Sequence, residues 1–202
     1  MNATAIRVLI ACAVLLRAGS APAQSRPRFE VGAYVTSTTS SEFDASDIGL
    51  GGRFSWNAIG PLWLDSEVSF YPRAFPDARP FSGARLEGLF GGTVGPRLGP
   101  ARPFAKLRSG FLSVRPASQP FACILIFPPP LSCELGAGRI LLASEFGGGV
   151  EVFPTQRIFA RVELGDRVIK YPGPVLDNHR AVRTDAFFSH DLRWAAGAGF
   201  RF

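Results

Sequence analysis

The clearest indication of the fold is residues 192–202, which read Leu192-Arg193-Trp194-Ala195-Ala196-Gly197-Ala198-Gly199-Phe200-Arg201-Phe202. Every second side chain, from Leu192 to Phe202, is apolar, whereas the five positions between them hold Arg193, Arg201, two glycines and one alanine. A period of two residues is that of a β-strand, whose successive side chains point to opposite faces. This stretch therefore predicts a strand with one apolar face and one face that carries arginines.

Seven further segments show the same alternation, and no sustained 3.6-residue period indicates a helix. They are residues 28–36, 48–57, 62–71, 85–94, 105–111, 145–152 and 158–164. Their lengths approach the roughly 9 to 11 residues that a tilted barrel strand needs to cross a bilayer. The sequence predicts an all-β protein with eight antiparallel strands.

The connections between these segments alternate between short and long. The predicted turns are residues 57–61, 95–102 and 154–157, and the predicted loops are residues 37–47, 72–84, 115–139 and 167–189. Outer-membrane barrels combine an even strand number with short periplasmic turns and longer external loops. We therefore predict an eight-stranded up-and-down transmembrane β-barrel with both chain termini in the periplasm.

The N-terminus has the pattern of a secretory signal peptide. Arg7 precedes an apolar run over residues 8–16, and Ala21-Pro22-Ala23 forms a cleavage site before Gln24. Residues 1–23 are the predicted signal peptide and residues 24–202 the predicted barrel domain. A lipoprotein cleavage box ending at Cys12 is the weaker alternative, because only a very short apolar core precedes this cysteine.

Charge and cysteine content narrow the functional classes. Without Arg7 and Arg17 of the signal peptide, 20 of the 22 basic residues remain against 16 acidic ones, a net charge of +4. Arginine and glutamate are interleaved rather than clustered, which argues against nucleic acid as a partner. An exported chain can form disulfides, so a bridge between Cys123 and Cys133 is allowed and would close one local loop.

The chain resembles the small outer-membrane barrels of the OmpA and OmpX type over nearly all of residues 24–202. The likeness is sharpest in residues 192–202, where an alternating last strand ends in Phe202. The resemblance implies that this strand is the signal recognised by the barrel-assembly machinery. It also implies the fold and a location in the lipid of the outer membrane, but it indicates no particular activity.

The alternation alone leaves open which face of the barrel is charged. A lipocalin-like soluble barrel would have an apolar interior and a wet exterior. Here the charged faces carry seven acidic and eight basic residues, a balance expected of confined charges. Each lipid-facing charge would cost about 2–4 kcal/mol at the bilayer midplane. We therefore predict that an inward network plugs the lumen, which in an eight-stranded barrel has room only for side chains.

The predicted lumen network has fourteen members, and Arg28 is a further basic residue expected to face inward. The members are Glu30, Arg53, Asp65, Glu67, Arg85, Glu87, Lys106, Arg108, Glu145, Glu151, Arg161, Glu163, Arg193 and Arg201. The inward glycines are expected to make room for large Arg and Tyr side chains. They are Gly49, Gly51, Gly147, Gly149, Gly197 and Gly199.

The predicted function is a structural or surface-interaction role, with four loops that could contact an extracellular partner. A narrow channel selective for solute charge is the first alternative, although water-filled pores usually need about 16 strands. A lipid A-modifying enzyme is a weaker one. Ser189-His190-Asp191 could supply a nucleophile and a base, but neighbours on an extended chain point to opposite sides. With His179 as the second histidine, we expect no catalytic site, no metal site and no cofactor.

Residues 121–133 are strongly apolar for a loop expected in water. Exposed apolar patches usually indicate a contact surface. One interpretation is a disulfide-braced tip that binds a partner or dips into the outer leaflet. The other is a loop that folds over the mouth of the barrel and packs against its neighbours.

Overall fold

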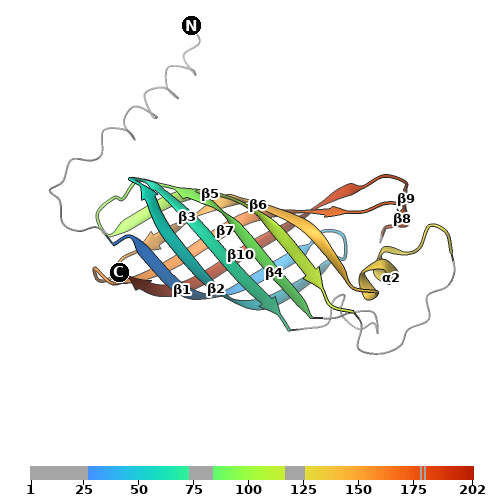
Figure 1. The fold of residues 1–202 in the computed structure, drawn as a ribbon, viewed down its shortest axis with the longest axis horizontal. Coiled ribbons are helices and arrows are strands. Elements are labelled where there is room, and N and C mark those ends of the chain that lie inside the picture. Colours follow the sequence, from blue (N-terminus) through green and yellow to red (C-terminus); the bar gives the residue numbers. More distant parts are fainter. Residues whose placement is uncertain (1–26, 73–83, 117–125, 178, 180) are drawn as a thin grey trace, which may run out of the picture.

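The computed structural model describes residues 27–72, 84–116, 126–177, 179 and 181–202. Within them, eight strands form a closed antiparallel barrel in the order β1-β10-β7-β6-β5-β4-β3-β2 (Figure 1). The strands are β1 (Phe29–Ser40), β2 (Ala45–Ile59), β3 (Leu62–Tyr71), β4 (Arg85–Val94), β5 (Ala101–Val114), β6 (Arg139–Val152), β7 (Ile158–Tyr171) and β10 (Phe187–Arg201). The predicted eight-stranded antiparallel fold is confirmed.

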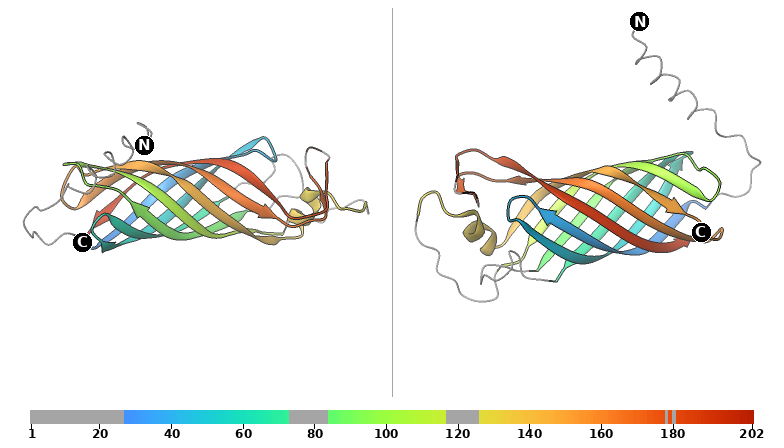
Figure 2. Two further views of the ribbon diagram at one scale, coloured as in Figure 1. Left: turned by 90° about the horizontal axis from the view of Figure 1, so that it is seen from above. Right: turned by 180° about the vertical axis from the view of Figure 1, so that it is seen from behind.

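The two ends of the barrel differ in their connections. At one end, which we call the turn end, β1 begins, β10 ends, and short connections join β2 to β3, β4 to β5 and β6 to β7. The opposite end, the loop end, carries α2 (Leu131–Gly136) and a small sheet of β8 (Val175–Leu176) and β9 (Val182–Arg183) (Figures 1 and 2). Among the described residues, no helix has the length and apolar character needed to cross a membrane.

The alternation of the sequence becomes the inside and outside of the barrel. In β3, Leu62, Val68 and Phe70 are exposed, whereas Asp65 and Glu67 are buried. The same pattern places the large apolar side chains of all eight barrel strands largely on the outer surface. At the turn end, aromatic rings stack outside, because the Phe29 ring centroid lies 6.0 Å from that of Phe54 and 6.0 Å from that of Phe202. The outer surface is therefore apolar, whereas the charged side chains of the strands lie inside.

The predicted first long loop is wrong. Residues 37–40 continue β1 and residues 45–47 begin β2, so the connection shrinks to residues 41–44. The Ser and Thr side chains in this region are small enough to pair across the two strands. Thr39 Oγ1 and Ser46 Oγ lie 2.9 Å apart outside the barrel, and Thr38 Oγ1 lies 3.1 Å from the Tyr71 hydroxyl inside it. Asp44, with a φ of 48°, closes the turn.

Other predicted boundaries also move. β5 begins at Ala101 inside a predicted turn, β7 continues to Tyr171 and β10 begins at Phe187, inside the predicted fourth loop. Arg28 was expected to face the lumen, but it precedes β1 and is exposed, so this assignment is wrong. The predicted signal peptide, residues 1–23, lies outside the described residues and stays a prediction.

Candidate functional site

The middle of the lumen is organised around Arg108, whose side chain is fully buried. Its guanidinium nitrogens lie 2.8 Å from Asp65 Oδ2 and 3.0 Å from Glu67 Oε1, both on β3. They also lie 3.3 Å from Glu145 Oε2 on β6 and 3.3 Å from Glu163 Oε1 on β7. Buried ions need such partners, because water no longer solvates them.

Other ion pairs join strands on different sides of the barrel. Arg53 Nη2 of β2 lies 2.8 Å from Glu163 Oε1 of β7. Arg193 Nη2 of β10 lies 3.3 Å from Glu67 Oε2 of β3, and its Nη1 lies 2.9 Å from Glu145 Oε2 of β6. The pairs therefore cross the interior rather than follow neighbouring strands around the wall.

All fourteen residues predicted to form the lumen network are buried, and each takes part in at least one ion pair. The sequence interpretation missed four further members, which are Asp47, Arg102, Arg167 and Asp191. These four residues continue the two-residue alternation beyond the strand boundaries that we had predicted. Following the alternation further along the sequence would have found them. With them, the buried charged residues of the barrel strands number nine acidic and nine basic.

The added residues continue the network toward the loop end. Arg167 Nη1 lies 2.6 Å from Glu87 Oε2, and its Nη2 lies 2.7 Å from Asp191 Oδ2. Arg85 of β4 pairs with Asp47 of β2, across the intervening β3. Charge pairs thus line the interior from the turn end toward the loop end.

Aromatic rings fill the spaces left by glycines in the wall. A Cβ at Gly51 would overlap the ring of Tyr34, and a Cβ at Gly49 would lie 2.7 Å from Tyr71 Cδ1. The Tyr34 hydroxyl lies 2.8 Å from Ser69 Oγ, and the guanidinium carbon of Arg53 lies 5.1 Å from the centroid of its ring. These two glycines therefore make room for tyrosine rings.

Between the charged layers and the loop end, the interior becomes apolar. The two-residue period of the sequence did not predict this apolar layer. Leu112, Leu141 and Ile169 point inward and are buried. Leu131 and Leu135 of α2 pack onto them from the loop end. Leu131 thus places the end of the 121–133 segment over the loop-end mouth of the barrel, as one of the two interpretations expected.

Two other residues of the 121–133 segment do not pack against the barrel. Ile126 and Phe127 are exposed, the latter by 86%, whereas Cys123 lies outside the described residues. The Cys123–Cys133 disulfide therefore stays a prediction. An apolar tip and a packed base thus coexist in one connection.

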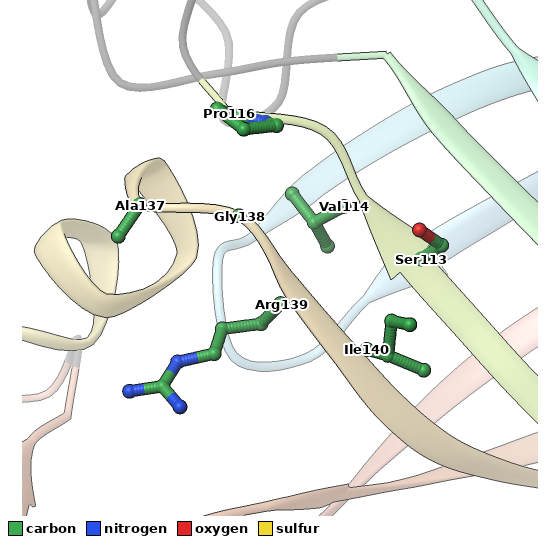
Figure 3. A pocket seen from close by; sticks show the side chains of 7 residues that line it. All are labelled: Ser113, Val114, Pro116, Ala137, Gly138, Arg139 and Ile140. Carbon is green, nitrogen blue, oxygen red and sulfur yellow. The ribbon is translucent and has the colours of Figure 1, made fainter.

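A small pocket of about 220 Å³ opens at the rim between β5 and β6 (Figure 3). It is lined by Ser113, Val114, Pro116, Ala137, Gly138, Arg139 and Ile140. Gly138 has a φ of 83°, and a Cβ there would lie 2.8 Å from the Pro116 ring. The guanidinium of Arg139 already pairs with Glu134, so the pocket offers little charge for a ligand.

The β7–β10 connection contains a hydrogen-bonded aspartate. Asp177 Oδ1 accepts a hydrogen bond from the backbone N–H of Ala181 at 2.7 Å, and Arg183 Nε lies 3.0 Å from Oδ2. Burial raises the pKa of Asp177, but these hydrogen bonds and the charge of Arg183 outweigh it and hold the pKa below its ordinary value.

Of the three residues considered for catalysis, His190 is separated from the other two, whereas Ser189 Oγ lies 3.5 Å from Asp191 Oδ1. Ser189 points into the barrel, where its Oγ lies 3.2 Å from Ser41 Oγ, and Asp191 pairs inside with Arg167. His190 points outward, and its Nδ1 lies 2.7 Å from Asp166 Oδ2. His190 therefore cannot act as the base that activates Ser189 as a nucleophile. In the described part of the chain, no group of His, Cys, Asp and Glu could hold a metal ion.

Solved structures offer three comparisons. The chain is similar to Neisserial surface protein A (NspA), with 14% sequence identity, 86% of this chain and 97% of that chain covered, and a TM-score of 0.53. The N-terminal barrel of Pseudomonas aeruginosa OprF matches with 12% identity, coverage of 86% and 97%, and a TM-score of 0.48. Pseudomonas aeruginosa OprG matches with 13% identity, coverage of 87% and 96%, and a TM-score of 0.48.

Neither a family model nor a curated protein matches the sequence. The likeness to NspA defines the fold: the chain is a closed eight-stranded barrel of the type found in small outer-membrane proteins.

Proposed function

We propose that this chain is an integral protein of the bacterial outer membrane with a structural or surface-interaction role, and that its lumen is closed to solutes. The apolar outer surface supports the membrane location, because lipid-facing positions must be largely free of charge. The barrel strands of this chain are 10 to 15 residues long. They are therefore long enough to cross a bilayer, which takes roughly 9 to 11 residues of a tilted strand.

The proposed orientation has the turn end in the periplasm and the loop end outside. The long β5–β6 and β7–β10 connections at the loop end support it, because external connections are the longer ones in such barrels. Phe202 lies at the turn end with its ring on the outer surface, 65% exposed. This position suits contact with the barrel-assembly machinery during insertion.

The observation that carries the closed lumen is the set of ion pairs that cross it. Arg108 and Arg193 each bridge carboxylates from different strands, and both side chains are fully buried. The apolar layer of Leu112, Leu141 and Ile169 under α2 supports a second closure at the loop end. A conducting path would have to break both layers.

Single-channel recording tests this proposal. The mature protein, residues 24–202, is refolded and checked by its different gel mobility before and after boiling, and is then added to planar bilayers. We expect no conductance from the folded barrel. Steady, salt-dependent current steps would make the narrow channel the better function.

The surface-interaction role rests on the exposed tip of the β5–β6 connection. Phe127 is 86% exposed and follows the exposed Ile126, so together they offer an apolar surface for contact with a partner. The proposed Cys123–Cys133 bridge would hold this tip. Protease digestion of folded protein tests the bridge: Cys123→Ser should accelerate cleavage of the connection, and unchanged cleavage would remove the case for a functional disulfide.

A further inference from the structure

At the turn end of the lumen, three arginine side chains lie over two aromatic rings. We call Arg97, Arg102, Arg201, Trp63 and Phe153 the mouth cluster. The guanidinium carbons of Arg97 and Arg201 lie 4.7 Å and 4.2 Å from the centroid of the Phe153 ring. That of Arg102 lies 4.3 Å from the centroid of a Trp63 ring and 5.9 Å from that of Phe153. Three guanidinium groups thus converge on one ring.

The mouth cluster has more positive than negative charge. Its carboxylate partners are Glu30, which lies 3.1 Å from Arg102 and 2.8 Å from Arg201, and Glu151, which pairs with Arg102. Glu151 also serves a fourth arginine deeper in the lumen. Arg97 forms no ion pair with any described residue. Three guanidinium groups therefore share less than two full carboxylate charges.

Two buried arginines of the cluster keep a donor without an acceptor among the described residues, and one of these donors is Arg102 Nε. Arg201 is 5% exposed, and its Nη1 makes no hydrogen bond within the described part of the protein. A buried N–H without an acceptor is costly, so the site favours an added acceptor. Arg97, by contrast, is exposed and open to molecules that approach from the solvent.

The surface around the mouth is also basic. Arg28, Arg97 and Arg157 are exposed at the turn end, and the connecting residues there, 57–61, 95–100 and 153–157, include no acidic residue. Connections at the loop end do include acidic residues, among them Asp44 and Glu134. A one-signed surface around a site attracts ligands of the opposite charge.

We propose that the mouth cluster is a binding site for an oxyanion, a carboxylate or phosphate group of a soluble molecule that reaches the turn end. Of the Arg97 side-chain nitrogens, only Nε has a partner among the described residues, the Gly99 carbonyl oxygen at 3.3 Å, so the terminal N–H groups of Arg97 can bind the oxygens of an anion. The cluster lies on the inward side of the strands, whereas lipid contacts their outward side, so a soluble anion fits better than a lipid headgroup. That this molecule is periplasmic rests on the orientation in the proposed function.

Trp63 supplies a reporter inside the site. The chain has 3 tryptophans. Replacement of the outward-facing Trp56 and Trp194 by Phe leaves Trp63 as the only source of tryptophan emission. The refolded protein in neutral detergent is titrated with inorganic pyrophosphate, and we expect a saturable change in Trp63 emission. Because Arg97 is exposed, Arg97→Gln should fold normally, yet it should weaken binding about ten-fold or more, as expected for the loss of a charge-assisted hydrogen bond.

Arg139→Gln is the matched control, since it removes an exposed arginine at the opposite end, and it should bind like the parent. A response that only follows ionic strength, or an Arg97→Gln variant that binds like the parent, would overturn the site. Binding of phosphatidylglycerol in the micelle without binding of pyrophosphate would overturn the soluble ligand.

The orientation is tested separately with Arg97→Cys in a background in which Cys123 and Cys133 are replaced by serine. A membrane-impermeant maleimide should label this cysteine only after the outer membrane is permeabilised. Labelling in intact cells would refute the proposed orientation and the periplasmic source, and would leave the measured oxyanion affinity unaffected.

Discussion

Replacement of Arg108 by methionine is the sharpest test of the lumen network. The variant keeps an unbranched, flexible stem but removes the guanidinium, which contacts four carboxylates at 2.8 to 3.3 Å. Those carboxylates would then be left with an excess of negative charge in the middle of the barrel. We expect Arg108→Met to fold but to unfold at a lower urea concentration.

The expected magnitude follows from the geometry. At an effective dielectric constant of about 20, Coulomb's law gives ~6 kcal/mol for unit charges at the 2.8 Å separation of Arg108 and Asp65. Part of this attraction is offset, because methionine carries no desolvation cost and Asp65 keeps Arg161 as a second partner at 3.2 Å. Breaking one side of a buried ion pair usually costs about 3–5 kcal/mol, which is the loss that we predict.

Urea unfolding of the barrel in lipid vesicles, followed by tryptophan emission and by gel mobility without boiling, measures the loss. Asp65→Asn in the same chain should recover about 0.5–3 kcal/mol of it as a coupling energy, because neutrality is restored. Arg139→Met, which breaks an exposed pair with Glu134, should cost at most about 1 kcal/mol. Equal stabilities of Arg108→Met and Arg139→Met, or strictly additive effects with Asp65→Asn, would refute the reasoning.

Three further variants probe the wall, the cap and a loop. Gly51→Ala should lower the free energy of unfolding by about 1–3 kcal/mol, because its Cβ would overlap the Tyr34 ring; a variant of parental stability in urea would show that the ring shifts freely. Leu131 is the first residue of α2 and is 1% exposed. Leu131→Ala should accelerate protease cleavage of the β5–β6 connection, since truncating a buried leucine costs about 2–5 kcal/mol; equal cleavage rates would contradict the packing. The lowered pKa of Asp177 means that its stabilisation is present above the unfolded-state pKa and is lost as pH falls through the folded-state value. The hydrogen-exchange protection of the Ala181 amide should therefore decrease on acidification, and Asp177→Asn should abolish this pH dependence.

Much of the barrel could be predicted because strand alternation is a local property. Residues 62–71 and 85–94 were predicted as strands with the bounds that the structure has, since their outward apolar and inward charged side chains follow a two-residue period, although glycines weaken it in 85–94. The charged face could be assigned inward because a charge is costly in lipid, not because of the period itself.

The prediction failed where local signals were weak. Residues 37–40 and 45–47 are rich in small polar side chains, which are as common in loops as at strand ends, so a four-residue connection was taken for a long one. Asp47 and Arg102 were lost from the lumen for the same reason, since the strands were drawn too short. Only pairing with the neighbouring strand fixes where such a segment ends.

The sequence by itself determined the strand number, the barrel class and the identity of most interior charges, because each follows from a two-residue period and the cost of exposing a charge to lipid. Only the tertiary structure decided which charges pair. Arg53 and Glu163 are 110 residues apart in sequence and meet across the lumen. The apolar layer under α2 and the mouth cluster around Phe153 likewise depend on residues from several strands. Closure of the sheet brings these residues together, and no local pattern records that closure.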